Sequence, residues 1–346
     1  MRFSPPLDHG QRRGFPGPRA VASSPDGSAP RSAAAPDTLA VIQGALTSIP
    51  LTCPRWGRGW CVAAASILEA SAPKAGNVHP GASFADLFHD DFVAAALAIA
   101  PVFEAAAAAP VGVPVRAAVE ASAAVTRSNA NLGIVLALAP LAAVPREAGS
   151  AAQAIGNGAV ERVLAGLTPA DAAAVWQAIA VARPGGLGTS ARFDLDGPPP
   201  VDLRAAMAHA ADRDQIAALW ARGYAGLLAG PVADLAREFA AGAGLADAIV
   251  RAHVVQLARE PDSLIARRHG PARAAEVSRA AAAIPLATAA WRTAVADFDG
   301  GLRAAGVNPG TSADLIAAAL YILLDDAGLR DRCGLSRLLA PVRAER

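Results

Sequence analysis

From Asp37 onward, the chain shows the apolar periodicity of helices and little of the alternation typical of strands. Alanine, the strongest helix former, supplies 91 of the 346 residues. No stretch alternates for long enough to build a sheet, and no internal repeat is visible. We therefore predict an all-α fold with a single large multi-helix domain, near the upper size of one hydrophobic core.

The first 36 residues differ in composition, being rich in Pro, Gly, Ser and Arg with little periodicity. We interpret 1–36 as a disordered N-terminal extension or the product of a misplaced start codon, and 37–346 as the helical domain. Helices are expected at about 37–48, 58–71, 91–109, 115–127, 131–144, 151–166, 169–182, 202–222, 231–240, 245–259, 262–269, 271–298, 311–326 and 330–340.

Three helix boundaries carry local signals. Thr168 precedes a proline and stands three residues before Asp171, which predicts a capped helix start. The same spacing recurs in Thr311-Ser312-Ala313-Asp314, where we expect a second capped start. Arg267-Arg268-His269-Gly270 is typical of a helix end, with cations on the last turn and glycine after it.

Charge and hydropathy exclude several classes of function. With 31 basic and 30 acidic residues the net charge is +1, so nucleic acid and anionic membrane surfaces are not expected partners. No segment reaches the roughly 18 to 20 apolar residues that span a bilayer, and the N-terminus lacks an apolar signal region. The three cysteines form no CxxC pair, which favours a reduced, cytoplasmic protein.

Rare residues gather in short polar segments at predicted helix boundaries. Lys74 is the only lysine, against 30 arginines, and it lies in the segment 71–81 with Gly76, Asn77 and His79. Such a loop supplies a cation and backbone donors for phosphate, although a solvated connection between helices explains it equally. The acids that follow, Asp86, Asp90 and Asp91, would hold Mg²⁺ or cap a helix.

Five further segments share this character. Each alone is explained as a helix boundary, but six in one chain predict loops that converge on one cleft. No Walker A, HExxH, GxSxG or GxGxxG pattern is present, and zinc is not expected. The five segments are 126–133 with Asn129 and Asn131, the glycine-rich 183–188, 209–214 with Asp212 and Arg213, 261–270 with Asp262, Ser263 and Arg267, and 308–314 with Asn308, Thr311 and Asp314.

Taken in order, these segments resemble the triphosphoribosyl-dephospho-CoA synthase family over about residues 55–326. The matches are Ser71–Asn77, Asn129–Gly133, Asp262–Gly270 and Pro309–Leu315. The resemblance implies an all-α enzyme in which the 2′-hydroxyl of 3′-dephospho-CoA attacks C1 of the ATP ribose and adenine leaves. Ala75 stands where the family usually has proline, and the continuation from Asn77 to Phe84 also departs. The chain therefore looks like a divergent branch, whose acceptor can differ from that of the citrate-lyase branch.

The implied chemistry assigns roles to the rare residues. Displacement at an anomeric carbon needs a carboxylate, a base for the incoming hydroxyl and support for the leaving group. We expect Asp212 or Asp314 to be that base. Lys74 and Arg267 would contact the triphosphate, Asp90 or Asp91 together with Asp262 would hold Mg²⁺, and Asn77, Asn129 and Asn131 would orient ribose or adenine. The remaining candidates for binding ATP or the second substrate are Gly76, His79, Arg213, Ser263, Asn308 and Thr311.

Two other functions stay open from the sequence. One is an ATP-dependent ribosyl or phosphate-ligand enzyme on the same scaffold with a different acceptor, for example in pterin-linked one-carbon metabolism. The other is a non-catalytic helical nucleotide-binding protein. A homodimer is compatible with the apolar helices, although no residue argues for it specifically.

Overall fold

The computed structural model describes residues 53–106, 109–126, 131–146, 155–182, 184 and 192–339. Every regular element there is helical, and the only strand-like pairs in these ranges are the bridges His79–Ala82 and Phe84–Leu87. The all-α prediction is confirmed. The predicted extension 1–36 and the first expected helix, 37–48, lie outside the described residues.

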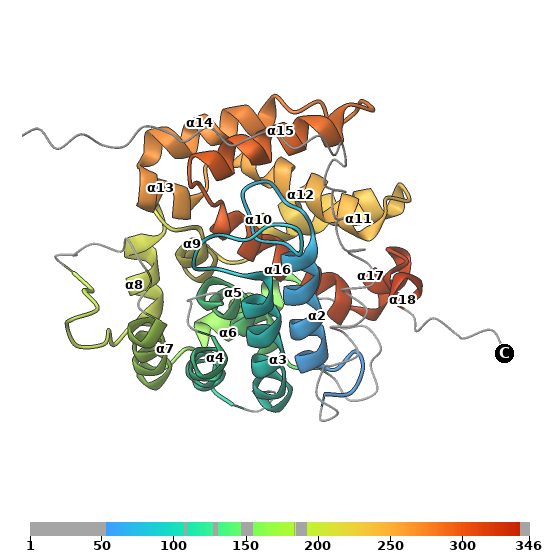
Figure 1. The fold of residues 1–346 in the computed structure, drawn as a ribbon. Helices are drawn as coiled ribbons and strands as arrows, with labels where there is room; N and C mark the ends of the chain where they lie inside the picture. The colour runs from blue at the N-terminus through green and yellow to red at the C-terminus, as the bar shows by residue number, and fades with distance from the viewer. Residues whose placement is uncertain are drawn as a thin grey trace, which may run out of the picture. The chain divides into compact units, whose positions relative to one another are not determined.

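The described helices are short and run in several directions (Figure 1). Their bounds are α2 Arg58–Ser71, α3 His89–Ala105, α4 Gly112–Val125, α5 Leu132–Ala142, α6 Asn157–Ala165, α7 Pro169–Ala182, α8 Leu203–Ala210, α9 Gln215–Arg222, α10 Ala225–Leu227, the π-helical turn η2 Leu228–Val232, α11 Ala233–Ala240, α12 Leu245–Arg259, α13 Ser263–His269, α14 Pro271–Ala282, α15 Trp291–Ala304, α16 Gly310–Asp325, α17 Ala327–Arg332 and α18 Leu335–Leu338.

Two long predicted helices are each divided in the structure. The expected helix 202–222 becomes α8 and α9, because Asp214 Oδ1 accepts hydrogen bonds from the amides of Ile216 and Ala217 and so starts a new helix. The expected helix 271–298 becomes α14 and α15, separated by a connection that contains Pro285. Proline disfavours helical geometry in the residue before it, which explains the break.

Of the three predicted helix boundaries, two are confirmed and one is wrong. The cap at α7 is confirmed: the amide of Thr168 donates to Asp171 Oδ2 at 2.9 Å, and the amide of Asp171 donates to Thr168 Oγ1 at 3.2 Å. The end of α13 is also confirmed, with Gly270 at φ +88°. The predicted second cap is wrong. Thr311 lies inside α16, and the carboxylate that meets this helix start comes from Asp262, 50 residues earlier.

Helix α16 forms the centre of the core. Apart from its two ends and Asp314, its side chains are buried, and it contacts α2, α5, α12 and α13. α2 packs in turn on α3, and α4 packs on both α3 and α7 (Figure 1). The polar segments before α5, α9, α13 and α16 thereby come to the same end of the core.

A proline inside the apolar helix α5 ties distant parts of the core together. Pro140 has no N–H to donate to the carbonyl of Leu136, four residues back, and its ring crowds this turn of the helix. Trp220 Nε1 donates to Leu136 O at 3.0 Å, and the hydroxyl of Tyr224 donates to Ala137 O at 2.9 Å. Both donors are fully buried, so they satisfy carbonyl groups that water cannot reach.

We predict that Trp220→Phe lowers the free energy of unfolding by about 1 to 3 kcal/mol, because the Leu136 carbonyl is left buried without a donor. Urea denaturation measures the change. The matched control is Trp176→Phe, since Trp176 is also buried but its indole nitrogen has no hydrogen-bond partner within the described residues. Equal losses in the two variants would contradict this account of the hydrogen bond.

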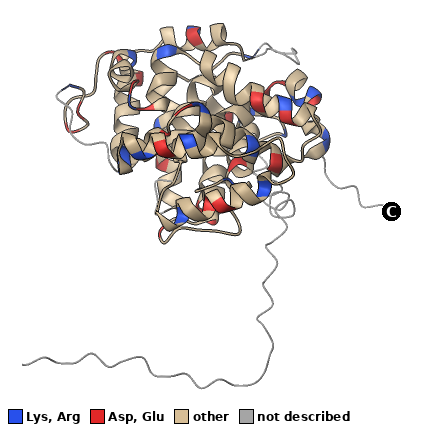
Figure 2. Ribbon diagram, turned by 90° about the horizontal axis from the view of Figure 1, so that it is seen from above, with Lys and Arg blue, Asp and Glu red and all other residues tan. Residues whose placement is uncertain are grey.

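Charged residues of both signs are interspersed over the helices rather than gathered by sign (Figure 2). Within the described ranges, no single helix is both long enough and apolar enough to cross a membrane; α6 and α7 meet that test only as a pair, bent by 98°.

Candidate functional site

A cavity of about 960 Å³ opens where the polar segments meet. Its walls come from the end of α2, the start of α3, the start of α5, one face of α7, the α8–α9 corner, α13 and the start of α16. This volume lies within the usual range for small-molecule sites. The polar segments were predicted to converge on one cleft. Five of them contribute Asn77, Gly133, Asp214, Arg267 and Asn308 to the lining of this cavity.

Two carboxamides from opposite ends of the sequence line one side of the cavity. Asn77 Nδ2 donates to Asn308 Oδ1 at 2.9 Å, while the buried Asn77 Oδ1 has no partner among the described residues. The pair is held by its neighbour Gly76, whose amide donates to Asp299 Oδ1 at 2.7 Å. Gly76 has φ +74°, and a Cβ there would lie 2.7 Å from Pro309 Cδ, so only glycine fits.

Asp314 lies on the first turns of α16, with its carboxylate at the start of α5. The carboxylate occupies the space that a Cβ on Gly133 would need, so the glycine allows this close approach. Burial raises the pKa of Asp314 well above that of an ordinary aspartate, and the negative charges of Glu69, Asp262 and Asp214 raise it further. Asp314 is therefore a cavity carboxyl that holds its proton to a higher pH than an ordinary aspartate does.

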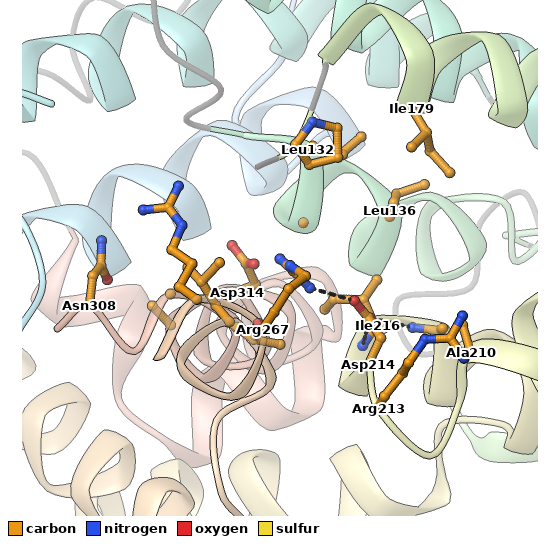
Figure 3. Close-up of a pocket in the computed structure, with 18 of the residues that line it drawn as sticks. Leu132, Leu136, Ile179, Ala210, Arg213, Asp214, Ile216, Arg267, Asn308 and Asp314 are labelled. Atoms are coloured by element: carbon orange, nitrogen blue, oxygen red, sulfur yellow. Dashed lines mark hydrogen bonds and ion pairs between the residues drawn. The ribbon is translucent and has the colours of Figure 1, made fainter. Parts of the chain in front are cut away.

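Three arginines line the cavity, Arg267 and Arg268 on α13 and Arg213 at the α8–α9 corner. Arg267 Nη1 is 2.9 Å from Asp214 Oδ2, an ion pair that Figure 3 marks by a dashed line. Arg213 donates to the carbonyl of His209 at 3.0 Å, and no acidic partner is recorded for Arg268 within the described part of the chain. Guanidinium groups with unused donors suit phosphate oxygens, which accept charge-assisted hydrogen bonds.

The buried neighbour of this cavity is Lys74. Its Nζ lies 2.8 Å from Glu69 Oε1 and donates to the carbonyls of Glu69 and Ala72 at the end of α2. Lys74 is fully buried behind the wall, whereas Glu69 lines the cavity. Burial raises the pKa of Glu69, and Lys74 partly offsets that effect. The predicted contact of Lys74 with a triphosphate stays a prediction.

Asp262 connects two of the polar segments. Its Oδ1 accepts from the Ile265 amide at 3.0 Å, and its Oδ2 accepts from the Ser312 amide at 2.7 Å. Nearby, Ser263 Oγ is 3.1 Å from Thr311 Oγ1. Only Thr311 of this group lines the cavity, so Asp262 and Ser263 position the starts of α13 and α16.

The three predicted magnesium ligands are not brought together. Asp90 is exposed, Asp91 lines the cavity and caps α3 by accepting from the Phe88 amide at 3.1 Å, and both oxygens of Asp262 accept amide hydrogen bonds. Among the residues that the structure describes, no three or more His, Cys, Asp or Glu side chains form a group that could hold a metal. These residues do not fit a preformed metal site.

The remaining candidates are divided between the cavity and its surroundings. Asp212 is exposed outside it and pairs with Arg222. His79 lies beside the carboxamide pair rather than in the cavity; burial, reinforced by Arg303, lowers its pKa to about 4. Asn129 lies outside the described residues, while Asn131 is buried at the start of α5 with neither amide atom partnered among them.

The other side of the cavity carries a group of apolar side chains. Trp176 and Ile179 on α7 lie near Leu136 of α5, Met207 of α8 and Ile216 of α9. In Figure 3, Asn308 is on one side, Leu136 and Ile179 are on the other, and Asp314 and Arg267 lie between them. The sequence interpretation missed this wall, together with Glu69 and Arg268. Arg268 adjoins Arg267, which it named, but no local pattern distinguishes Trp176 from core.

The cavity of this all-α scaffold combines arginines, carboxamides and a protonatable carboxyl, which are groups that suit a phosphorylated ligand. The family model described as ATP:dephospho-CoA triphosphoribosyl transferase matches residues 56–332. The chain belongs to this family and is a triphosphoribosyl transferase. The predicted resemblance is confirmed.

A solved structure shares the fold. It is the crystal structure of a proposed triphosphoribosyl-dephospho-CoA synthase from Archaeoglobus fulgidus, 23% identical, with a TM-score of 0.52. The match covers 67% of this chain and 98% of the other. No curated protein matches the chain.

Proposed function

We propose that the protein transfers a 5-triphosphoribosyl group from ATP to the 2′-hydroxyl of 3′-dephospho-CoA, with release of adenine. Membership of the family supports the donor and the acceptor. The observation that carries the proposal for the site is the placement of Asp314 between the carboxamide pair and the apolar wall, beside Arg267 (Figure 3).

In this reaction the acceptor oxygen forms a bond to C1 of the ATP ribose while the bond from C1 to the adenine nitrogen breaks. The bonding electrons leave with adenine, which takes up a proton, and the acceptor hydroxyl loses one. In its ionised form Asp314 would accept the hydroxyl proton, since the carboxylate of a group with a raised pKa is a stronger base than an ordinary aspartate. Asn77 and Asn308 would hydrogen-bond to the adenine edge, with the unpartnered Asn77 Oδ1 as an acceptor for its amino group.

The triphosphate would lie against Arg213, Arg267 and Arg268. Because the predicted metal ligands do not come together, we propose that Mg²⁺ enters as part of the ATP complex rather than in a preformed protein site. We also keep the cytoplasm as the proposed compartment, since the three cysteines form no CxxC pair. The homodimer stays a prediction.

The test of the reaction incubates purified protein with ATP, Mg²⁺ and dephospho-CoA. We expect free adenine and a product heavier than dephospho-CoA by one triphosphoribosyl unit, detected by chromatography and mass spectrometry. Adenine release that requires a different acceptor would replace dephospho-CoA in the proposal. ATP binding without adenine release for any acceptor would overturn it in favour of a non-catalytic protein.

Arg268→Ala should raise the KM for ATP about 10- to 100-fold, because one charge-assisted hydrogen bond to the triphosphate is lost. The kcat should change less, since Arg268 does not reach the reacting carbon in this proposal. Arg279→Ala, on an exposed part of the neighbouring helix α14, is the matched control and should leave the KM unchanged. Equal effects of the two variants would contradict the phosphate role.

A further inference from the structure

We propose that the apolar side of the cavity binds a heteroaromatic ring of the acceptor and that the indole N–H of Trp176 donates a hydrogen bond to the edge of this ring. The inference rests on the proposed function, and it specifies the part of the acceptor that does not react. It also makes Trp176 a residue that determines acceptor specificity.

The apolar side has the composition of a ring-binding wall. Trp176 and Ile179 stand three residues apart on α7 and so share one helix face. Leu136, Met207 and Ile216 complete the wall from α5, α8 and α9, and each of these three is at most 7% exposed. Aliphatic and thioether side chains contact ring faces favourably, and they offer no partner for a charged group.

Trp176 supplies an independent sign of a ligand. The residue is 9% exposed and lines the cavity, yet its Nε1 has no hydrogen-bond partner within the described residues. The buried donors Trp220 and Tyr224 in the same core are both satisfied. A buried N–H without an acceptor is unfavourable and uncommon in folded proteins. A ring nitrogen or ring carbonyl of a bound molecule would provide the missing acceptor.

The positions of the other cavity groups indicate that the ring on the apolar wall belongs to the acceptor rather than to ATP. Displacement at C1 brings the incoming hydroxyl to the side opposite the leaving adenine. The carboxamide pair, suited to an adenine edge, lies on one side of Asp314, and the apolar wall lies on the other (Figure 3). A molecule that presents its hydroxyl to Asp314 from the apolar side therefore places its own ring near Trp176 and Ile179.

The experiment separates ring binding from turnover. The probe is 2′-deoxyadenosine, which keeps an uncharged heteroaromatic ring but lacks the 2′-hydroxyl that would react. Its binding to the full chain is measured by calorimetry in the presence of saturating ATP, so that the donor site is filled. We expect Trp176→Phe, which keeps a ring but removes the N–H, to weaken probe binding about 5- to 10-fold. The affinity for ATP should stay within about twofold of the original.

Two further variants keep the result interpretable. Trp291→Phe is the matched control, because Trp291 is buried outside the cavity and its ring contacts the guanidinium groups of Arg251 and Arg292. It should change neither affinity. Ile179→Trp enlarges a side chain that points into the apolar side, and it should weaken the probe without weakening ATP.

The failures of the two proposals are distinguishable. If the wild-type protein does not bind 2′-deoxyadenosine, or if Trp176→Phe binds it as well as the wild type, the inference is overturned. It is also overturned if Trp176→Phe weakens ATP instead. A third outcome is that Trp176→Phe loses probe binding while the wild-type protein does not turn over dephospho-CoA. This result would support the ring site and reject dephospho-CoA as the acceptor.

Discussion

Asp314→Asn should lower kcat by about 100- to 10,000-fold, the range for loss of a general base. The amide keeps the shape of the side chain but cannot take up the hydroxyl proton. The KM for ATP should change little, because the arginines that would hold the triphosphate are intact. Steady-state adenine release measures both constants. Asp212→Asn serves as the comparison, since Asp212 is exposed outside the cavity and should be dispensable. A large loss in Asp212→Asn with activity retained in Asp314→Asn would reverse the assignment.

Asp314→Asn should also change how the folding stability depends on pH. The pKa of Asp314 is raised in the folded state, so the native protein keeps a proton that the unfolded chain releases above about pH 4. Folding stability therefore falls as pH rises from that value through the raised pKa. Asparagine never ionises, so the Tm of Asp314→Asn relative to the wild type should increase with pH across this window. A pH-independent difference would show that Asp314 titrates normally.

Lys74→Met should lower the free energy of unfolding by about 3 to 5 kcal/mol, because Glu69 then remains buried without its cation. The carbonyls of Glu69 and Ala72 lose a donor at the same time. Urea denaturation measures the loss. The double variant Lys74→Met with Glu69→Gln should recover part of it, since no unpaired charge remains. A Lys74→Met protein that is fully stable but has lost ATP binding would instead favour direct contact with phosphate.

The all-α fold class was predictable because helix propensity and the spacing of apolar residues are local properties that can be read within each segment. The errors arose where residues distant in sequence decide the outcome. Nothing near Thr311 shows that Asp262 meets the start of its helix. The sequence also does not show the buried ion pair of Lys74 with Glu69, while the contact of Lys74 with the triphosphate stays a prediction. Most residues of the site could be selected as rare polar residues, but the apolar wall could not, because Trp176 and Ile179 resemble any buried helix face.

The two-way bonding of Asp262 has a consequence for how the protein responds to its substrates. One buried carboxylate holds amides of both α13 and α16, so the two helix starts cannot slide apart without leaving that charge unpaired. Arg267 and Arg268 lie on α13, and Asp314 lies on α16. In the proposed reaction, a shift of the arginines on binding an anion would therefore be passed through Asp262 to the start of α16, which carries Asp314. Binding of the triphosphate and alignment of Asp314 would then be thermodynamically linked through a single side chain.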